Sequence, residues 1–196
     1  MKYLSGYMFG SPCRAVALVI MISLMGSSCI KSEYAKLVEQ ELAKGYRMDS
    51  VILGIHLGMS RKEFYSYCWA MNKQHIFTNS GTKVLYKFYD GDDTVVMKFY
   101  PDFLNDSIYQ VQATYQYQGW MPWVLHRQPD SLQVRLRKKF EKLSGLGFIK
   151  VERGGLYKDF AFVKVDGNRR IVMFRESEME LKTVFTDLRS EKRIKK

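Results

Sequence analysis

Few residues in this sequence have a type and spacing suited to catalysis or metal binding. His56, His75 and His126 lie in three separate segments, and none has a second ligand at helical or hairpin spacing, so the sequence predicts no metal site. Cys68 falls on the apolar face of a predicted helix, where a cysteine is usually a small buried hydrophobic residue. No phosphate-binding glycine loop or nucleophilic-serine motif occurs in the sequence. The sequence therefore predicts a protein that is not an enzyme and needs no cofactor.

Another cysteine, Cys29, follows an apolar stretch and three small residues. Residues 1–28 contain only two charged residues, Lys2 and Arg14, followed by an apolar stretch over 15–25. This order is typical of a secretory signal peptide. The apolar stretch is shorter than the ~18 residues that a membrane-spanning helix needs, so a permanent transmembrane helix is the weaker interpretation.

The stretch LMGSSC, residues 24–29, resembles the lipobox of bacterial lipoproteins in a relaxed form. In that family the cysteine thiol takes a thioether-linked diacylglycerol, the preceding peptide is removed, and the new N-terminus is acylated. The resemblance implies that Cys29 anchors the protein in a lipid membrane, since two or more acyl chains give a stable anchor. The alternative is an ordinary signal peptide cut after Ser28, which releases a soluble protein and leaves a Cys29–Cys68 disulfide open.

The charge of the mature chain favours an anionic partner. Loss of residues 1–28 lowers the net charge from +11 to +9 and leaves 168 residues, which suits one domain or two small repeats. A basic chain of this kind can bind lipid headgroups, acidic glycans or an acidic protein, and its charge would also suit nucleic acid. Export from the cytoplasm argues against nucleic acid as the partner.

The first half of the mature chain reads as helices followed by three strands. Apolar residues at helical spacing predict a short helix over 34–44, and Ser60 with Glu63 forms a capping box for the next helix. Alternating apolar residues predict strands over 83–89, 94–100 and 108–117. Asp90-Gly91 is a hairpin signal between the first two strands.

The second half repeats this pattern. Pro129 begins a predicted helix that Gly145 ends, and segments of strand character follow at 147–152, 159–165, 169–175 and 180–188. Asp166-Gly167 lies 76 residues after Asp90-Gly91. We therefore predict an α+β fold in which two α-β-β-β repeats form an antiparallel sheet with helices packed on one face. The predicted segments are a signal peptide (1–28), a lipidated tether and short helix (29–50), a first repeat (51–118), an aromatic linker (119–128), a second repeat (129–188) and a frayed basic tail (189–196).

The stretch ILGIHLGMSRKEF, residues 52–64, carries a family resemblance. Ile55 followed by Gly58-Met59-Ser60 and an amphipathic helix resembles the start of the small outer-membrane lipoproteins of the BamE (SmpA/OmlA) type. Tandem repetition makes the chain similar to the β-lactamase inhibitor protein fold, in which two such units form one concave sheet. The resemblance implies an outer-membrane location and a role in binding another protein.

Three surfaces are candidate binding sites. The first is a basic helix face, suited to anionic lipid or an acidic partner. The second is the linker, whose tryptophans could stack on sugars or anchor a protein interface. The third is the sheet face that the helices leave open, which could bind a protein partner, be covered by a terminal segment or pair in a homodimer. The residues are Arg135, Lys138, Lys139 and Lys142 for the first, Trp120 and Trp123 for the second, and Lys87, Tyr89, Lys98, Tyr100, Val172 and Phe174 for the third.

Together these features predict a non-enzymatic, lipid-anchored envelope protein that binds another envelope protein through the open sheet face, as a scaffold or an inhibitor. The outer membrane is the expected location. A second hypothesis is a lipoprotein that binds glycan or peptidoglycan through the linker tryptophans. A third, a lipoprotein hydrolase, requires a catalytic constellation that the sequence does not contain.

Overall fold

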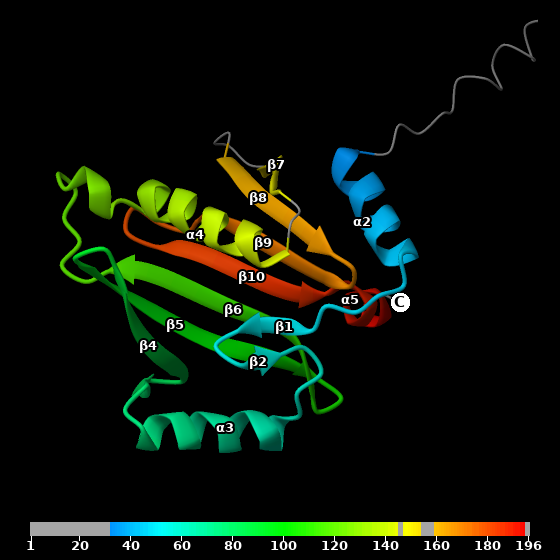
Figure 1. Ribbon diagram of the computed structural model, residues 1–196, viewed down its shortest axis with the longest axis horizontal. Coiled ribbons are helices and arrows are strands. Elements are labelled where there is room, and N and C mark those ends of the chain that lie inside the picture. The colour runs from blue at the N-terminus through cyan, green and yellow to red at the C-terminus, as the bar shows by residue number, and fades with distance from the viewer. Residues whose placement is uncertain (1–31, 145–146, 154–158, 195–196) are drawn as a thin grey trace, which may run out of the picture. The chain divides into compact units, whose positions relative to one another are not determined.

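The computed structural model describes residues 32–144, 147–153 and 159–194, and these residues form an α+β structure (Figure 1). One large antiparallel sheet is accompanied by a small hairpin and a few helices. The elements in chain order are α2 (Glu33–Ala43), β1 (Ser50–Ile52), β2 (Ile55–His56), α3 (Arg61–Lys73), β3 (Phe77–Ser80), β4 (Lys83–Asp90), β5 (Asp93–Leu104), β6 (Ser107–Tyr117), the 3₁₀ helix η1 (Leu125–Arg127), α4 (Pro129–Ser144), β7 (Ile149–Arg153), β8 (Asp159–Asp166), β9 (Arg169–Arg175), β10 (Leu181–Asp187) and α5 (Leu188–Ile194).

The strands of the large sheet lie in the order β3-β4-β5-β6-β10-β9-β8-β7. β6 and β10, which are far apart in sequence, therefore lie side by side at the centre, and Thr114 pairs with Lys182 (Figure 1). Successive side chains of a strand point to opposite faces. We call the face that bears Met97 and Tyr115 the inner face, and the face that bears Lys98 and Thr114 the outer face.

The main hydrophobic core covers the inner face. Phe64 of α3 and Phe140 of α4 are buried in the same cluster as Met97 and Tyr115 of the sheet. The β1–β2 hairpin adds Ile55 to this cluster. α3 and α4 therefore both pack on one face, as the sequence predicts.

Local sequence signals account for the start of α3 and for the β4–β5 hairpin. The Ser60 hydroxyl accepts a hydrogen bond from the Glu63 amide at 3.2 Å, and the Ser60 amide donates to the Glu63 carboxylate at 2.8 Å. This is the predicted capping box. Asp90 pairs with Asp93 across the predicted turn, where Gly91 has a φ of 64° that favours glycine.

The helix α2, which the sequence assigns to the tether and not to either repeat, packs on the outer face. Tyr34 and Leu37 of α2 pack against a second cluster that contains Val163 and Val165 of β8. Figure 1 shows α2 beside β8 and its following turn. The reason is that β8 has apolar side chains on both faces of the sheet, and those on the outer face must be shielded from water.

Two elements differ from the sequence prediction. α3 is followed by four strands and not three, because Phe77–Ser80 forms the short strand β3, whereas the four segments of predicted strand character after α4 form β7 to β10. Its sequence, FTNS, has a single buried apolar residue, Phe77, and no readable alternation. The C-terminal segment predicted to fray forms α5. Asp187, directly before this helix, accepts hydrogen bonds from the Arg189 amide (3.0 Å) and the Ser190 hydroxyl (2.8 Å).

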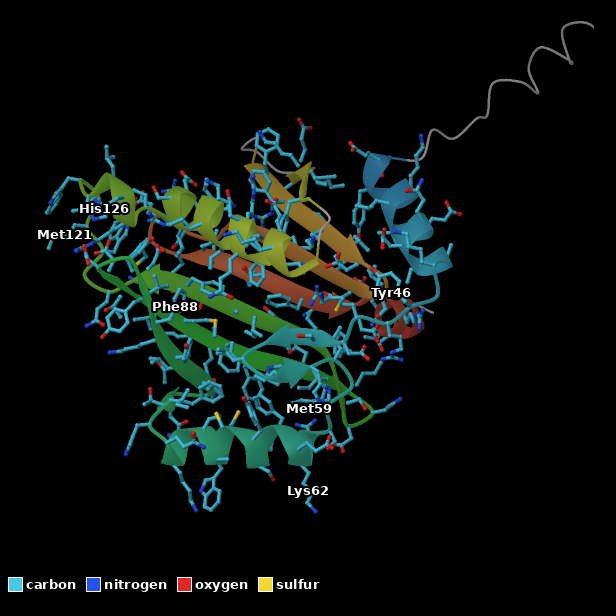
Figure 2. All side chains as sticks on the ribbon, in the orientation of Figure 1. Tyr46, Met59, Lys62, Phe88, Met121 and His126 are labelled. Carbon is cyan, nitrogen blue, oxygen red and sulfur yellow. The ribbon has the colours of Figure 1, made fainter. Side chains whose placement is uncertain are left out.

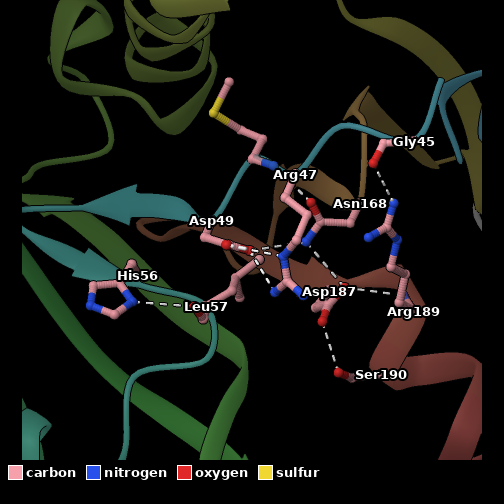
Figure 3. A network of polar contacts seen from close by, with 10 residues as sticks. Gly45, Arg47, Asp49, His56, Leu57, Asn168, Asp187, Arg189 and Ser190 are labelled. Carbon is pink, nitrogen blue, oxygen red and sulfur yellow. Dashed lines mark hydrogen bonds and ion pairs between the residues drawn. The ribbon is translucent and has the colours of Figure 1, made fainter.

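A buried polar network ties the segment after α2 to the sheet (Figure 3). The Asn168 side chain accepts from the Met48 amide at 2.7 Å and donates to Asp49 and Asp187 at 3.2 Å each. The Gly167 amide donates to the Glu41 carboxylate at 3.1 Å. We call Glu41, Asp49, Asn168 and Asp187 the polar clamp. It fixes α2 and the following segment to the β8–β9 turn and to the end of β10.

Candidate functional site

The loop between β6 and α4, residues 118–128, presents large apolar side chains to solvent. Trp123 is 74% exposed, Leu125 is 78% exposed and Met121 is 45% exposed. We call residues 118–128 the apolar loop. Figure 2 places Met121 and His126 at one end of the sheet and Tyr46, beside the polar clamp, at the other.

Gln128 holds the apolar loop in one conformation. Its Nε2 donates to the carbonyls of Met121 (3.1 Å), Pro122 (3.0 Å) and Val124 (3.2 Å). Its Oε1 accepts from the indole N–H of Trp120 at 3.3 Å. Trp120 is half-buried and its hydrogen bond to Gln128 stabilises the loop, whereas the side chain of Trp123 is exposed to solvent.

Two arginines fasten the same loop to its neighbours. Arg127 pairs with Asp93 at 2.7 Å and donates to the Gly119 carbonyl at 3.3 Å. Arg135 of α4 pairs with Asp90 at 2.7 Å and donates to the His126 carbonyl at 2.8 Å. The loop is therefore bound both to the β4–β5 turn and to α4.

An exposed apolar loop that is already ordered is well suited to binding. Ordering a flexible loop on association costs free energy, and a loop held in advance avoids that cost. Tryptophan is among the residues most enriched where truncation weakens protein interfaces most. The geometry of Trp123 and Leu125 thus fits a docking surface.

The outer face of the sheet continues this surface. A hollow of about 210 Å³ lies beside the start of the loop, lined in part by Val96, Gln116 and Gly119. The Gln116 amide contacts the Met179 sulfur at 3.1 Å, and Met179 is 40% exposed.

The sheet-face residues proposed from the sequence have different surroundings. Lys87 and Tyr89 are exposed and Lys98 is half-buried. Tyr100 bonds the Tyr65 hydroxyl of α3 at 2.6 Å, so it is tied to a helix.

Val172 and Phe174 do not lie on an open face, which corrects the sequence expectation. Both pack against the cluster under α2, and the Arg153 guanidinium lies 3.8 Å from the centre of the Phe174 ring. The helix α2 covers them. The sequence assigns this helix to the tether and does not indicate on which face of the sheet it packs.

The basic residues of α4 do not form one uniform surface. Arg135 is paired with Asp90, and the Lys139 ammonium lies 5.5 Å from the centre of the Phe88 ring. Lys138 and Lys142 are exposed.

The described residues include neither a reactive cysteine nor a cluster that could bind a metal ion. Cys68 packs against the main core, and burial raises the pKa of its thiol to about 11, which makes it a poor nucleophile at neutral pH. Residues 32–144, 147–153 and 159–194 contain no cluster of histidine, cysteine and acidic side chains suited to a metal ion. The predicted lipidation site Cys29 lies outside the described residues.

No helix within the described part of the chain combines the length and the apolar character needed to cross a bilayer.

Sequence reasoning found Trp123 but missed the residues that make its loop a site. Leu125 and Met121 extend the exposed apolar surface, while Gln128 and Arg127 fix its shape. The available signal was the density of large apolar residues in WMPWVL around a proline, between two well-predicted elements.

Comparisons with protein-family models, with curated proteins and with solved structures found no match.

Proposed function

We propose that this protein is a non-enzymatic envelope lipoprotein, anchored through acylated Cys29, that binds another envelope protein. The apolar loop provides the centre of the docking surface, and the adjoining end of the outer face, with Tyr89 and Lys98, provides its rim. The observation that carries this proposal is the high exposure of Trp123 and Leu125 on a loop that Gln128 and Arg127 hold in place.

The energetics favour burial of this loop against a partner. Burying a large apolar side chain contributes roughly 1.5–3 kcal/mol, and binding energy concentrates in a few such central residues. Rim charges such as Lys98 then add more to orientation and association rate than to affinity.

The position of the loop favours a protein over the anchoring membrane as its partner. Cys29 lies four residues before α2, and the polar clamp joins α2 to the Asp187 end of β10. The apolar loop follows Tyr117, beside the Leu181 end of β10. The seven residues of β10 separate these ends by roughly 23 Å, at about 3.3 Å per residue. The apolar loop and the polar clamp therefore lie at opposite ends of β10, and the chain leads to Cys29 from the clamp end.

A glycan ligand is less well supported. Sugar sites combine an aromatic ring with polar groups that fix orientation, but the large exposed side chains nearest to Trp123 in the loop sequence, Met121 and Leu125, are apolar. The polar side chains Gln128 and Arg127 are already bonded within the loop.

The fold itself supports a proposal of internal duplication. The strand order reads alike from both edges, with four strands after each of α3 and α4. The hairpin pairs Asp90–Asp93 and Asp166–Arg169 are 76 residues apart. We propose two α-β-β-β-β repeats, related to the BamE-like and β-lactamase-inhibitor-protein-like pattern of the sequence. Fold likeness of this kind does not by itself assign a function.

Photo-crosslinking tests the docking surface. A benzophenone amino acid replaces Trp123 in one variant and Trp69 in a control, since Trp69 is also exposed, at 63%, but lies on α3 with Lys73 over its ring. We expect a discrete protein adduct in cell envelopes from position 123 and none from position 69. Adducts of equal yield at both positions, or none at position 123, would refute the proposal.

The anchor is tested separately. Radiolabelled palmitate should label the wild-type chain and not the Cys29→Ser variant, and that variant should leave the membrane fraction. If the Cys29→Ser variant stayed in the membrane fraction without label, the proposed lipid anchor would be refuted. The proposal that the apolar loop docks a partner would be unaffected.

A further inference from the structure

A second recess lies on the inner face, on the opposite side of the sheet from the hollow beside the apolar loop. Its floor is the sheet, and its walls are α4 and the β1–β2 hairpin. Phe88, which forms part of the floor, lies on the inner face below α4 (Figure 2). We call this recess, of about 260 Å³, the inner-face pocket. The residues that line it include Ile52, Leu53, Phe88, Met97, Leu136 and Lys139.

The floor and walls of the pocket are apolar and firmly packed. Met97 and Leu136 are 3% and 5% exposed, so they are part of the core that surrounds the pocket. The rings of Tyr86 and Phe88 stack with centroids 6.0 Å apart and planes 20° apart, which gives a flat aromatic surface. The volume exceeds the ~150 Å³ of an apolar cavity that binds benzene. An aliphatic chain can therefore enter without displacing core residues.

Among the described residues that line this pocket, Lys139 is the charged one. Its ammonium forms no ion pair with any carboxylate in the described part of the chain, and it lies 5.5 Å from the centre of the Phe88 ring. The nearby Arg135 is neutralised by Asp90 at 2.7 Å. Lys139 is thus available to an anionic group at the pocket mouth.

The hairpin turn at the pocket edge holds a leucine in an unfavourable conformation. Leu53 has a φ of 49°, where asparagine or glycine is the usual residue of a two-residue turn. Its carbonyl accepts a hydrogen bond from the Tyr67 hydroxyl at 2.7 Å, which fixes the turn. Strained positions concentrate at ligand sites, and here the strain places an apolar side chain at the pocket edge.

We propose that the inner-face pocket binds an amphiphile with a single aliphatic chain and an anionic head. The chain lies over Phe88 and Met97, and the head pairs with Lys139. A free fatty acid and a single-chain anionic phospholipid share this chemistry. The proposal does not depend on the docking of a partner by the apolar loop.

The binding test uses the full chain carrying Cys29→Ser and a dansyl-labelled undecanoic acid as probe. We expect decanoate to displace the probe and decyltrimethylammonium, a cation with the same chain length, to displace it at least tenfold less well. Displacement should weaken as ionic strength rises, because Lys139 is exposed. Lysophosphatidylglycerol, tested in parallel, distinguishes the two sources: better displacement by decanoate indicates a free fatty acid, and better displacement by the lysolipid indicates a membrane lipid.

Two variants locate the site. Lys139→Glu should weaken decanoate binding by about tenfold, while Lys138→Glu, its exposed neighbour on the same helix, should leave it unchanged. Ile52→Trp should block the chain without reversing any charge. Thermal unfolding of each variant shows that it is folded.

Three results would overturn the proposal: no displacement by either anionic amphiphile, equal displacement by the cationic one, or equal weakening in Lys138→Glu and Lys139→Glu.

Discussion

The two ends of the central strands differ in which side chains they bury: one end buries polar side chains and the other exposes apolar ones. At one end the polar clamp buries Asn168 and Asp187 and gives the Asn168 side chain three hydrogen-bond partners. At the other end the apolar loop exposes Trp123 and Leu125 while its polar side chains bond inward.

The difference separates stability from recognition. A buried polar group is costly unless it is bonded, so a satisfied clamp fixes the fold and makes its partners hard to replace. An exposed tryptophan adds little to folding, and its presence on an ordered loop agrees with the docking role that we propose. Substitutions should therefore alter unfolding at one end and partner binding at the other.

The largest effect should come from Asn168→Ala. It leaves the Met48 amide without its side-chain acceptor and removes one hydrogen bond from each of the carboxylates of Asp49 and Asp187, so we expect the free energy of unfolding to fall by about 3 kcal/mol. Urea unfolding measures it. Asn79→Ala, at an exposed position of β3, is the matched control and should cost less than about 0.5 kcal/mol. Equal losses in the two variants would mean that the clamp does not stabilise the fold.

Next comes the double substitution Trp123→Ala and Leu125→Ala, which should act on binding alone. Loss of two central anchors should lower the yield of the crosslinked partner roughly thirtyfold, read from a benzophenone at Met121. The free energy of unfolding should change by less than about 0.5 kcal/mol. Trp69→Ala is the control for removal of an exposed tryptophan. A large loss of stability in the double variant would assign these side chains to the core.

Gln128→Glu tests whether the loop must be ordered in advance. Glutamate keeps the size and the acceptor for Trp120 but loses the N–H donors that bind Met121, Pro122 and Val124. We expect a loss of about 1 kcal/mol in stability and a severalfold loss of crosslink yield.

Gln118→Glu, in the same loop but with an exposed side chain, is the matched control for the added charge. Unchanged crosslinking in Gln128→Glu would show that preorganisation of the loop is unimportant.

The smallest effect concerns acid stability at the clamp. Burial alone would raise the pKa of Glu41, but hydrogen bonds from Lys44 and from the Gly167 amide outweigh it and lower that pKa. A lowered pKa gives stability that is present above the unfolded pKa of about 4.3 and is lost as pH falls through the folded pKa. The urea concentration at the unfolding midpoint should therefore decrease as the pH is lowered from 6 to 3, and the decrease should be smaller in Glu41→Gln. Glu178→Gln, at an exposed position, should behave as the wild type.

Sequence signals predicted the parts of the fold that depend on neighbouring residues. The capping box of Ser60 and Glu63 and the turn at Asp90-Gly91 are short-range devices, and β6 alternates visibly. The face covered by α2 and the role of Asn168 were not predicted, because each depends on contacts between segments some 120 residues apart.

The candidate site was predictable only in part for the same reason. Trp120 and Trp123 are three residues apart and chemically alike, yet one bonds Gln128 within the loop and the other faces solvent. Lys138 and Lys139 differ likewise, since only Lys139 lies over Phe88 at a pocket. Residue type and spacing do not distinguish members of such pairs, whereas tertiary packing does.

The central position of β10 has a consequence for biogenesis. Among the described strands β10 is synthesised last, yet it joins the two halves of the sheet through its pairing with β6 and β9. Until Leu181–Asp187 emerges, both neighbours present unpaired backbone edges, which readily associate with other chains. A nascent polypeptide of this kind needs shielding by a chaperone up to its final strand, and a premature stop codon even shortly before Leu181 would leave two open edges rather than a slightly shortened protein.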